Sequence, residues 1–525
     1  MANPSLQIGN SNWAIKEDNL LGYSTAGTRF VPQPITMTRA SAGTRVNSSG
    51  LVETVELLGS EEITNEDFTQ LPLGTGWDAY SSGTSTVAFT EGAVLSIDGS
   101  NSNVGVYQQN IFTSGVQYKI VVSVKATASF DALVSETDAA SSKGTIGTLN
   151  LTTSYQDFSF YYTGTGAWDL FIHRKYGETA GQNQQIYVKS VSVKESTKNN
   201  LARVDYDGTA SSLLVEPQRT NLIPYSEDFS DSSWTKTGSV SVSSNSVISP
   251  DGTLNGSTIT GLTGSGSNDL RFGTSINPAS TTYTSSVYLK GSGTIRMQMS
   301  NNVDNAGSET ITLSSSWVRY DLTHTFNSTT GSLALTLDDS GGTATTYDIW
   351  GAQLEEGSYA TSYIPTSGST VTRNQDQYSK TGISNLINSE EGSFFVDISA
   401  LNASPGSQLS ISLSGDNSND RVLIYTGSGG GEWICQFRKD STTIVTVKRN
   451  TTVTNQSKVA VSWKSGKYLM YIDGDKATTY SVGSETTSTT FEVDDLKNLQ
   501  FSPNHNSTSN LFYGKVKQLQ VFKTW

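Results

Sequence analysis

Few residues of this chain have the types and spacing that enzyme chemistry requires. The 525 residues include only three histidines, which match no metal-ligand spacing and no Ser/His/Asp pattern: His173, His324 and His505. The single cysteine, Cys435, lies in the strand-like run EWICQF and is interpreted as a small core residue. Adjacent carboxylates such as Glu355 and Glu356 point to opposite faces of a strand. The sequence therefore predicts a protein that is not an enzyme.

Sugar binding is the chemistry that the aromatic residues favour. The apolar C–H patches of a sugar stack on aromatic rings, while amides and carboxylates take its hydroxyl groups. Three aromatic residues lie beside loop-like polar neighbours and are the candidate carbohydrate-binding residues: Trp168, Tyr425 and Trp433. Other tryptophans lie within alternating strands and are predicted to be core: Trp317, Trp350 and Trp463.

One loop offers the oxygen ligands that calcium prefers. The run GDNSND at 415–420 contains four candidate ligands: Asp416, Asn417, Asn419 and Asp420. The run DGSNSN at 98–103 has a similar composition. Turn formation explains both runs as well. The sequence therefore fits two interpretations of these runs, a structural Ca²⁺ site and a simple turn. No other cofactor is predicted.

The charge of the chain limits its partners. A net charge of −14 and a pI near 4.8 argue against nucleic acid and anionic membranes, which would repel it. One cysteine allows no intrachain disulfide, which fits assembly in a reducing cytoplasm. We expect no secretory signal and no membrane insertion, since the N-terminus lacks a basic and apolar leader and no apolar run is long enough to span.

The elements that must position these residues are short strands. Alternating apolar runs recur about every ten residues between Gly, Asn, Ser and Asp breaks, as in YKIVVSVKA at 118–126. Charged residues make up 16% of the chain, but 50 aromatics supply more apolar surface than disordered chains carry. The predicted fold class is all-β, built from tandem antiparallel β-sandwich domains.

An internal repeat divides the chain. NEDFTQ at 65–70 resembles SEDFSD at 226–231, and Tyr118 and Tyr187 align with Tyr283 and Tyr347 at intervals of 160 to 165 residues. One β-module therefore occurs twice. The predicted copies are 60–198 and 222–375, with copy 1 inserted into an N-terminal connector made of 1–59 and 199–221, and with a further sandwich at 385–525.

The run LLVEPQRTNLIPYSEDF at 213–229 is interpreted as a rigid hinge between units. Pro217 and Pro224 cannot donate to a strand ladder, and Arg219 can donate to backbone carbonyls. A ligand-binding role for Arg219 is the alternative.

Several phrases resemble those of tailed-bacteriophage and prophage structural proteins of the tail-fibre, tailspike and minor-tail type. They are TRASAGTRVNSSGLVE, RVDYDG, LLVEPQRTNLIPYSEDF, GAQLEEGSYATSYIPTSGSTVTR and GKVKQLQVFKT. In that family the first two phrases tend to lie closer together, which supports an insertion of copy 1. The repeats resemble carbohydrate-binding jelly rolls, and 385–525 is similar to concanavalin-like or laminin-G-like sandwiches.

The resemblance implies a virion appendage such as a tail fibre. The N-terminal region would dock on other virion proteins, and the sandwiches would bind host-surface polysaccharide, by implication as a homotrimer. Such a protein is assembled in the host cytoplasm and becomes extracellular with the virion. A head fibre or decoration protein with a purely structural role is one alternative, and a glycan depolymerase is the other.

Overall fold

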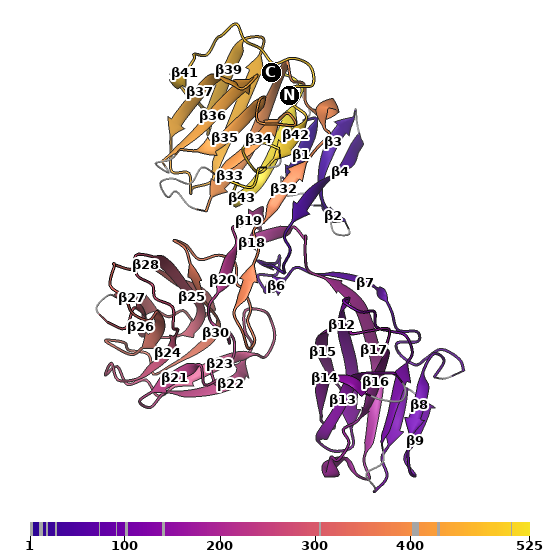
Figure 1. Ribbon diagram of the computed structural model, residues 1–525. Helices are drawn as coiled ribbons and strands as arrows, with labels where there is room; N and C mark the ends of the chain where they lie inside the picture. Colours follow the sequence, from indigo (N-terminus) through magenta and orange to yellow (C-terminus); the bar gives the residue numbers. More distant parts are fainter. Residues whose placement is uncertain are drawn as a thin grey trace. The chain divides into compact units, whose positions relative to one another are not determined.

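A computed structural model of the chain describes most of its residues. The described ranges are 4–9, 14–16, 19–26, 29–72, 74–90, 92–99, 103–138, 142–303, 306–401, 409–427, 431–505 and 507–525. Within them every element is a strand except two short 3-10 turns, η1 (Thr179–Gly181) and η2 (Ser384–Leu386). No helix in these ranges has the length and apolar character needed to cross a membrane. The predicted all-β fold of antiparallel sandwiches is confirmed (Figure 1).

Residues Glu56–Thr197 form a compact unit of two sheets, which contains copy 1. One sheet has the order β15 (Gln156–Thr163), β12 (Gln117–Ala126), β17 (Gln185–Thr197), β10 (Gly92–Ser96), β9 (Thr86–Thr90), and β7 (Leu57–Glu61) also pairs with β17. The other has the order β14 (Ser142–Leu151), β13 (Phe130–Thr137), β16 (Asp169–Arg174), β11 (Val104–Gln108), β8 (Asp78–Ser81). Alternating apolar residues of both sheets fill one core. Leu57 pairs with Thr197, so the two ends of the unit meet.

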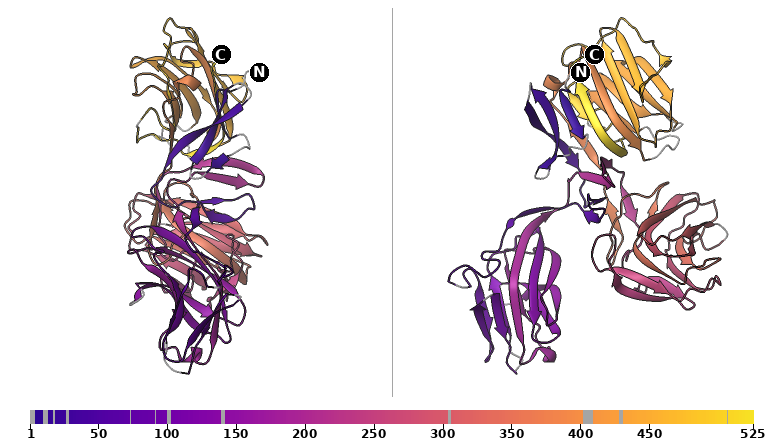
Figure 2. Two further views of the ribbon diagram at one scale, coloured as in Figure 1. Left: turned by 90° about the vertical axis from the view of Figure 1, so that its right-hand side faces the viewer. Right: turned by 180° about the vertical axis from the view of Figure 1, so that it is seen from behind.

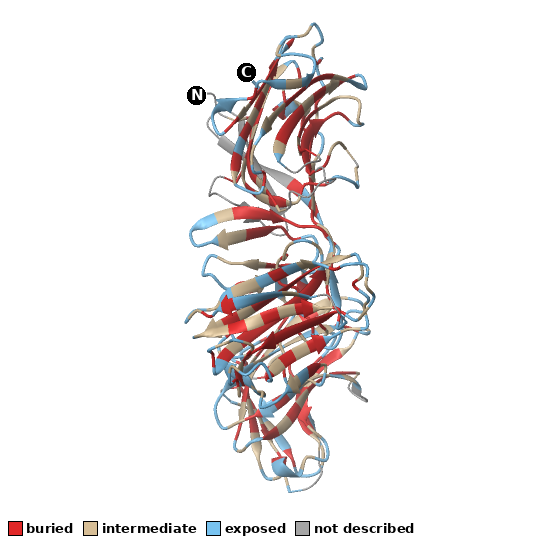
Figure 3. Cartoon of the chain, turned by 90° about the vertical axis from the view of Figure 1, so that its left-hand side faces the viewer, coloured by how far each residue is buried: buried red, intermediate tan, exposed pale blue. Residues whose placement is uncertain are grey.

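Copy 2 repeats this arrangement within the second compact unit, residues 1–55 and 198–525. One sheet has the order β21 (Trp234–Thr237), β24 (Asp269–Gly273), β29 (Ala334–Asp338), β26 (Thr294–Ser300), β27 (Ala306–Thr312). The other has the order β22 (Ser241–Val247), β23 (Gly256–Thr260), β30 (Thr346–Glu356), β25 (Thr282–Gly291), β28 (Val318–Thr325). Buried and exposed residues alternate along several of these strands (Figure 3).

The C-terminal sandwich also has two sheets. One contains β18 (Arg203–Asp207), β19 (Ala210–Val215), β43 (Gly514–Phe522), β33 (Glu391–Ala400), β38 (Ser457–Lys464), β39 (Lys467–Ile472) and β40 (Asp475–Lys476). The other contains β4 (Arg29–Thr38), β32 (Gln377–Lys380), β42 (Asn498–Gln500), β34 (Ser410–Ser414), β35 (Arg421–Thr426), β36 (Glu432–Lys439), β37 (Thr442–Asn450) and β41 (Thr479–Val482).

Several strands of the segment predicted as a separate connector, 1–59 with 199–221, pair with this sandwich: β1, β4, β18 and β19. One edge of β43 pairs with β1 (Leu6–Gly9) along one half and with β19 along the other, and β1 lies beside β43 in Figures 1 and 2. Leu6 and Leu213 are fully buried in the same core as the C-terminal strands. An open strand edge with an apolar face below it provides both the pairing groups and the driving force for this arrangement.

Smaller elements complete the segment. β2 (Ala14–Lys16) and β4 pair with β3 (Asn19–Ala26), and β5 (Thr44–Val46) forms a hairpin with β6 (Val52–Thr54).

A buried ionic cluster joins the phrases that resemble phage proteins. It contains three arginines and two carboxylates, all at most 3% exposed at the side chain: Arg39, Arg203, Arg373, Glu216 and Asp376. Arg39 Nη1 lies 2.8 Å from Asp376 Oδ1, and the Nη1 atoms of Arg203 and Arg373 lie 2.6 and 2.9 Å from Glu216 Oε2. Arg203 also pairs with Asp376. We name these five residues the ionic hub.

Hydrogen bonds from Ser362 also hold Glu216 of the ionic hub in place. The backbone N–H and hydroxyl of Ser362 both donate to Glu216 at 2.7 Å. Burial alone would raise the pKa of Glu216, but the charges of Arg373 and Arg203 lower it far below its ordinary value. Gly43 is needed beside the hub, since a Cβ there would lie 2.8 Å from Cζ of Arg39. The hub therefore links strands of this unit that lie far apart in the sequence.

The hinge run at 213–229 is anchored by this hub through Glu216. β20 (Arg219–Asn221) pairs with β31 (Val371–Arg373), and Asn221 Nδ2 donates to the carbonyls of Ala352 and Ile364. The guanidinium of Arg219 lies 5.4 Å from the centre of the Tyr359 ring and donates to Gln218 O. Arg219 also lines a cavity of about 890 Å³ together with polar groups, so its ligand-binding alternative stays a prediction.

Candidate functional site

An aromatic patch covers the outer side of one sheet of the unit Glu56–Thr197. Val106, Ile172 and Val134 of β11, β16 and β13 are fully buried and point into the core. Side chains alternate along a strand, so their neighbours Tyr107 and Phe171 point to the opposite side. Tyr80 of the edge strand β8 lies on this side too, since it pairs with Gly105. We name the patch formed by Tyr80, Tyr107, Phe171 and His173 the aromatic face.

The rings of the aromatic face contact one another around Phe171. Its ring centre lies 5.9 Å from that of Tyr80 and 6.2 Å from that of Tyr107, and both pairs meet edge to face. His173 stacks on Phe171 at 4.3 Å with an interplanar angle of 13°. Tyr80 is 40% exposed. These contacts fix the rings as a preformed surface, because aromatic pairs of this kind favour defined geometries.

Phe171 and His173 pack directly against Gly105. A Cβ at this position would lie 2.5 Å from Cε2 of Phe171 and 2.6 Å from Cβ of His173. It would also lie 2.5 Å from the carbonyl oxygen of Ile172 in the paired strand. Any larger residue would therefore push the rings and the paired strand away, so only glycine allows this close packing of Phe171 on the sheet.

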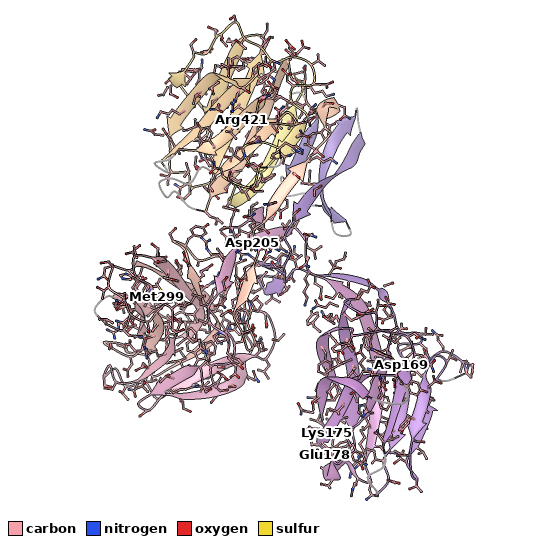
Figure 4. All side chains as sticks on the ribbon, in the orientation of Figure 1. Asp169, Lys175, Glu178, Asp205, Met299 and Arg421 are labelled. Atoms are coloured by element: carbon pink, nitrogen blue, oxygen red, sulfur yellow. The ribbon has the colours of Figure 1, made fainter. Side chains whose placement is uncertain are left out.

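Polar groups border the aromatic face. His173 Nε2 shares a hydrogen bond of 2.9 Å with the hydroxyl of Ser135, and its Nδ1 lies 2.8 Å from Arg174 O. Burial lowers the pKa of His173, so the ring is neutral near pH 7. Beyond the end of β16, Lys175 pairs with Asp131 at 3.1 Å, and Figure 4 marks Asp169 and Lys175 at the two ends of this strand.

This arrangement suits stacking and hydrogen bonding. The hydroxyls of Tyr80 and Tyr107 have no hydrogen-bond partner among the residues that the structure describes, so both can serve a ligand. Two carboxylates near the face already have partners: Asp131 is paired with Lys175, and Asp78 accepts a hydrogen bond from Gln109. The face is therefore a surface that can hold a ring-shaped ligand with apolar C–H patches and hydroxyl groups.

The equivalent side of copy 2 is polar. Strand order and register match Tyr80, Tyr107, Phe171 and His173 to Thr237, Arg271, Thr336 and Asp338, respectively. Arg296 of β26 forms a two-pronged ion pair with Asp338, with Nε 3.0 Å and Nη2 2.9 Å from Oδ2. Arg271 donates to Asn302 Oδ1 at 2.6 Å. Copy 2 thus lacks the stacking surface on this side.

Trp168, predicted to bind carbohydrate, lies outside the aromatic face. It directly precedes β16, is half-buried, and packs against the core of its unit. Lys143 Nζ lies 4.8 Å from the centre of its ring. Trp168 belongs to the unit Glu56–Thr197, whereas the other two predicted residues belong to the C-terminal sandwich.

The other two predicted residues lie on opposite sides of one sheet. Trp433 is fully buried in the core with Cys435 and Phe437, so no sugar can stack on it and its prediction was wrong. The physical reason is strand alternation, which gives these three residues of β36 the same side. Tyr425 of β35 is half-buried on the outer side, opposite Ile434.

The predicted calcium ligands mainly form local hydrogen bonds. Asp416 pairs with Lys497 at 2.8 Å, and Asp420 Oδ1 accepts from the N–H of Asp440 at 2.8 Å. Asn417 Oδ1 accepts from the N–H of Asn419, whose own Oδ1 accepts from Ser441. Across the described ranges, no three His, Cys, Asp or Glu side chains gather as a metal-binding group. A calcium ion here stays a prediction, and the run at 98–103 lies partly outside the described residues.

Comparison with known proteins finds similar solved structures but no sequence relatives. No protein-family model and no curated protein matches the chain. A tandem of two CBM22 domains from Paenibacillus barcinonensis Xyn10C matches with 11% identity over 57% of this chain and 98% of that chain, with a TM-score of 0.21. A family 29 carbohydrate-binding module matches with 15% identity over 27% and 90%, with a TM-score of 0.21. At these scores the likeness says nothing about what this chain binds.

Proposed function

We propose that this protein binds a neutral polysaccharide through the aromatic face of the unit Glu56–Thr197. The observation that carries the proposal is the position of Tyr80, Tyr107 and Phe171 on the side of the sheet that the core does not use. An aromatic patch on an outer surface has no role in filling the core, and such patches mark binding sites. A neutral ligand is indifferent to the net charge of −14, and the rings of the aromatic face offer no cation to an acidic group.

We further propose that the protein is a structural part of a phage virion, a tail fibre or similar appendage. The phrases that resemble phage structural proteins supply Arg39, Arg203, Glu216 and Arg373 of the ionic hub. Their role in this chain is thus to hold a framework that displays sandwich domains. Weak binding by one sandwich would be multiplied if several copies assemble, as in the homotrimer that the resemblance implies.

The test is a glycan array with the purified full chain, followed by a reducing-sugar release assay on each retained glycan. We expect retention of neutral polysaccharides without release, and we expect Phe171→Ala to abolish the retention. Thr336→Ala, at the position of copy 2 that corresponds to Phe171, is the matched control and should bind normally.

Other outcomes point to the alternatives. Release of reducing sugar would identify a depolymerase and would overturn a purely binding role. Absence of retention for every glycan would favour a structural decoration protein. Retention that survives Phe171→Ala would remove the aromatic face from the proposal.

A further inference from the structure

Two arginines face each other on the outer side of the C-terminal sandwich. Val422 and Phe437 are fully buried and pair across β35 and β36. Arg421 and Arg438 form the neighbouring pair of the same two strands, so both point away from the core. Both are half-buried, and Figure 4 labels Arg421 on this sheet.

This placement is unfavourable for the protein alone. Like charges directly opposite in a sheet repel each other, and burial makes the repulsion stronger. Burial lowers the pKa of Arg421, and the charge of Arg438 lowers it further. Among the described residues, no carboxylate forms an ion pair with either arginine, whereas the adjacent Lys439 lies 2.7 Å from Asp495. The chain has 48 acidic residues and 34 basic ones. It therefore has enough carboxylates to pair with every arginine, and yet this arginine pair has no carboxylate partner among the described residues.

Hydrogen bonds hold the arginines in place and leave donors unused. Gln436 Oε1 accepts from Nε and Nη2 of Arg421 at 3.2 and 2.8 Å, and Pro503 O accepts from its Nη1 at 3.4 Å. Nη2 of Arg438 donates to Ser441 O at 2.9 Å, while its Nε is buried and has no partner in the described part of the chain. Neutral oxygens therefore orient both guanidinium groups, but nothing compensates their charge.

The same face carries groups that suit a saccharide. Tyr425 lies on the strand of Arg421 four residues further on, which places the two Cα atoms about 13 Å apart along the strand. The Gln436 side chain lies between them on the neighbouring strand, with its amide N–H groups available. An aromatic ring and an amide next to a cationic pair match a ring with hydroxyl groups and one acidic substituent.

We infer that this face is a second binding site, for a saccharide that carries a carboxylate, sulfate or phosphate group between Arg421 and Arg438. The site is independent of the aromatic face, which lies in a different compact unit and suits a neutral ligand. The acidic group supplies the charge that the arginine pair lacks, and Tyr425 contacts the sugar ring.

The experiment is titration calorimetry of the full chain with a uronic acid hexasaccharide, a sulfated hexasaccharide and a neutral hexasaccharide. Hexaglutamate, inorganic sulfate and inorganic phosphate are tested alone. We expect one or both acidic saccharides to bind, with affinity that falls as salt rises. Arg421→Gln or Arg438→Gln should weaken this binding about 10- to 100-fold. Both variants should fold, since each relieves a repulsion, and a melting curve checks this.

Two control variants separate the possible outcomes. Arg449→Gln on β37 makes the same change of charge at an exposed pair with Asp475 and should leave binding unchanged. Phe171→Ala tests the proposed polysaccharide site and should leave binding of the acidic saccharide unchanged. The inference would be overturned if Arg449→Gln weakened binding as much as the two test variants, or if only Phe171→Ala weakened it. It would also be overturned if hexaglutamate bound equally well, if only the free anions bound, or if neither acidic saccharide bound.

Discussion

Copy 1 and copy 2 share a strand order, yet they present different chemistry on equivalent sheets. Copy 1 places Tyr107 and Phe171 beside each other across β11 and β16, and copy 2 places Arg271 and Thr336 in the same register. The residues that point inward are apolar in both copies, as Ile172 and Leu337 illustrate. The repeat therefore conserves the side of the strand that builds the core and varies the side that meets solvent.

The copies also differ in how they are anchored. The unit with copy 1 has its own core and two ends that meet at Leu57 and Thr197. Copy 2 belongs to the unit held by the ionic hub, and its β30 ends at Glu355 and Glu356 beside the hinge run. Each copy folds around its own core, but only the copy with the aromatic face is a separate compact unit, while the polar copy shares a unit with the ionic hub.

The largest effect is expected from the hub. Glu216→Gln removes the charge that Arg203 and Arg373 face, and an unpaired buried charge costs about 3–5 kcal/mol of unfolding free energy. Calorimetric melting of the full chain should show a large loss for the unit of copy 2 and no change for the unit of copy 1. Asp475→Asn, which breaks an exposed pair, should cost less than about 1 kcal/mol. Equal losses in both units would contradict the separation of the copies.

The next effect concerns binding. Tyr107→Ala combined with Phe171→Ala should weaken polysaccharide binding about 30-fold or more, since buried aromatic contacts contribute about 2 kcal/mol or more to binding. The matched double variant of copy 2, Arg271→Ala with Thr336→Ala, should not change the affinity. Isothermal titration with a retained polysaccharide measures both. A loss in the copy 2 variant would show that the polar face takes part.

A smaller effect is expected from one glycine in each copy. Gly105→Ala brings a Cβ to 2.5 Å from Ile172 O, and overpacking of this kind costs about 1–3 kcal/mol. Gly273→Ala in β24 of copy 2 meets only the end of the Arg271 side chain, Nη2 at 3.7 Å and Cζ at 3.9 Å, and should change stability by about 0.5 kcal/mol or less. Denaturant unfolding of both variants tests the difference. Equal stability of the two variants would show that the close packing of Phe171 on Gly105 is not required for stability.

The smallest effect is a pH dependence that His173 adds to copy 1; His324 of β28 adds one to copy 2, because burial lowers its pKa as well. Burial lowers the pKa of His173 in the folded state, so the unfolded chain binds more protons once the pH falls below about 6.5. The stability of this unit should be constant above pH 7 and should decrease as the pH falls from 6.5 toward the folded pKa. Melting temperatures of the parent and of His173→Gln at pH 7.5 and 5.5 measure this. An identical decrease in the variant would assign it to other groups.

The alternation of side chains along the strands made the fold class predictable. The same alternation indicates which aromatic residues lie on the core side and which on the outer side, and the site prediction did not use this. Trp433 is two residues from Cys435, which was interpreted as core, so the shared side already indicated burial. Phe171 lies in DLFIHR, where apolar residues occupy both sides of the strand. Since one side fills the core, such a run indicates an apolar outer surface and could have identified the aromatic face.

The ionic hub could not be predicted from local patterns. Arg39 meets Asp376 across 337 positions of sequence, and Arg203 meets the same carboxylate across 173. Each residue alone looks like a surface charge in a polar loop. Only the pairing of distant strands brings these charges together, and that pairing is a property of the whole fold.

The meeting of Leu57 with Thr197 has a practical consequence. A module whose entry and exit strands are already hydrogen-bonded neighbours can be removed or exchanged while the host chain keeps both of its own ends in register. The host strands can then carry modules with different surface chemistry at one position, and exchange at this junction leaves the pairing of the host strands unchanged.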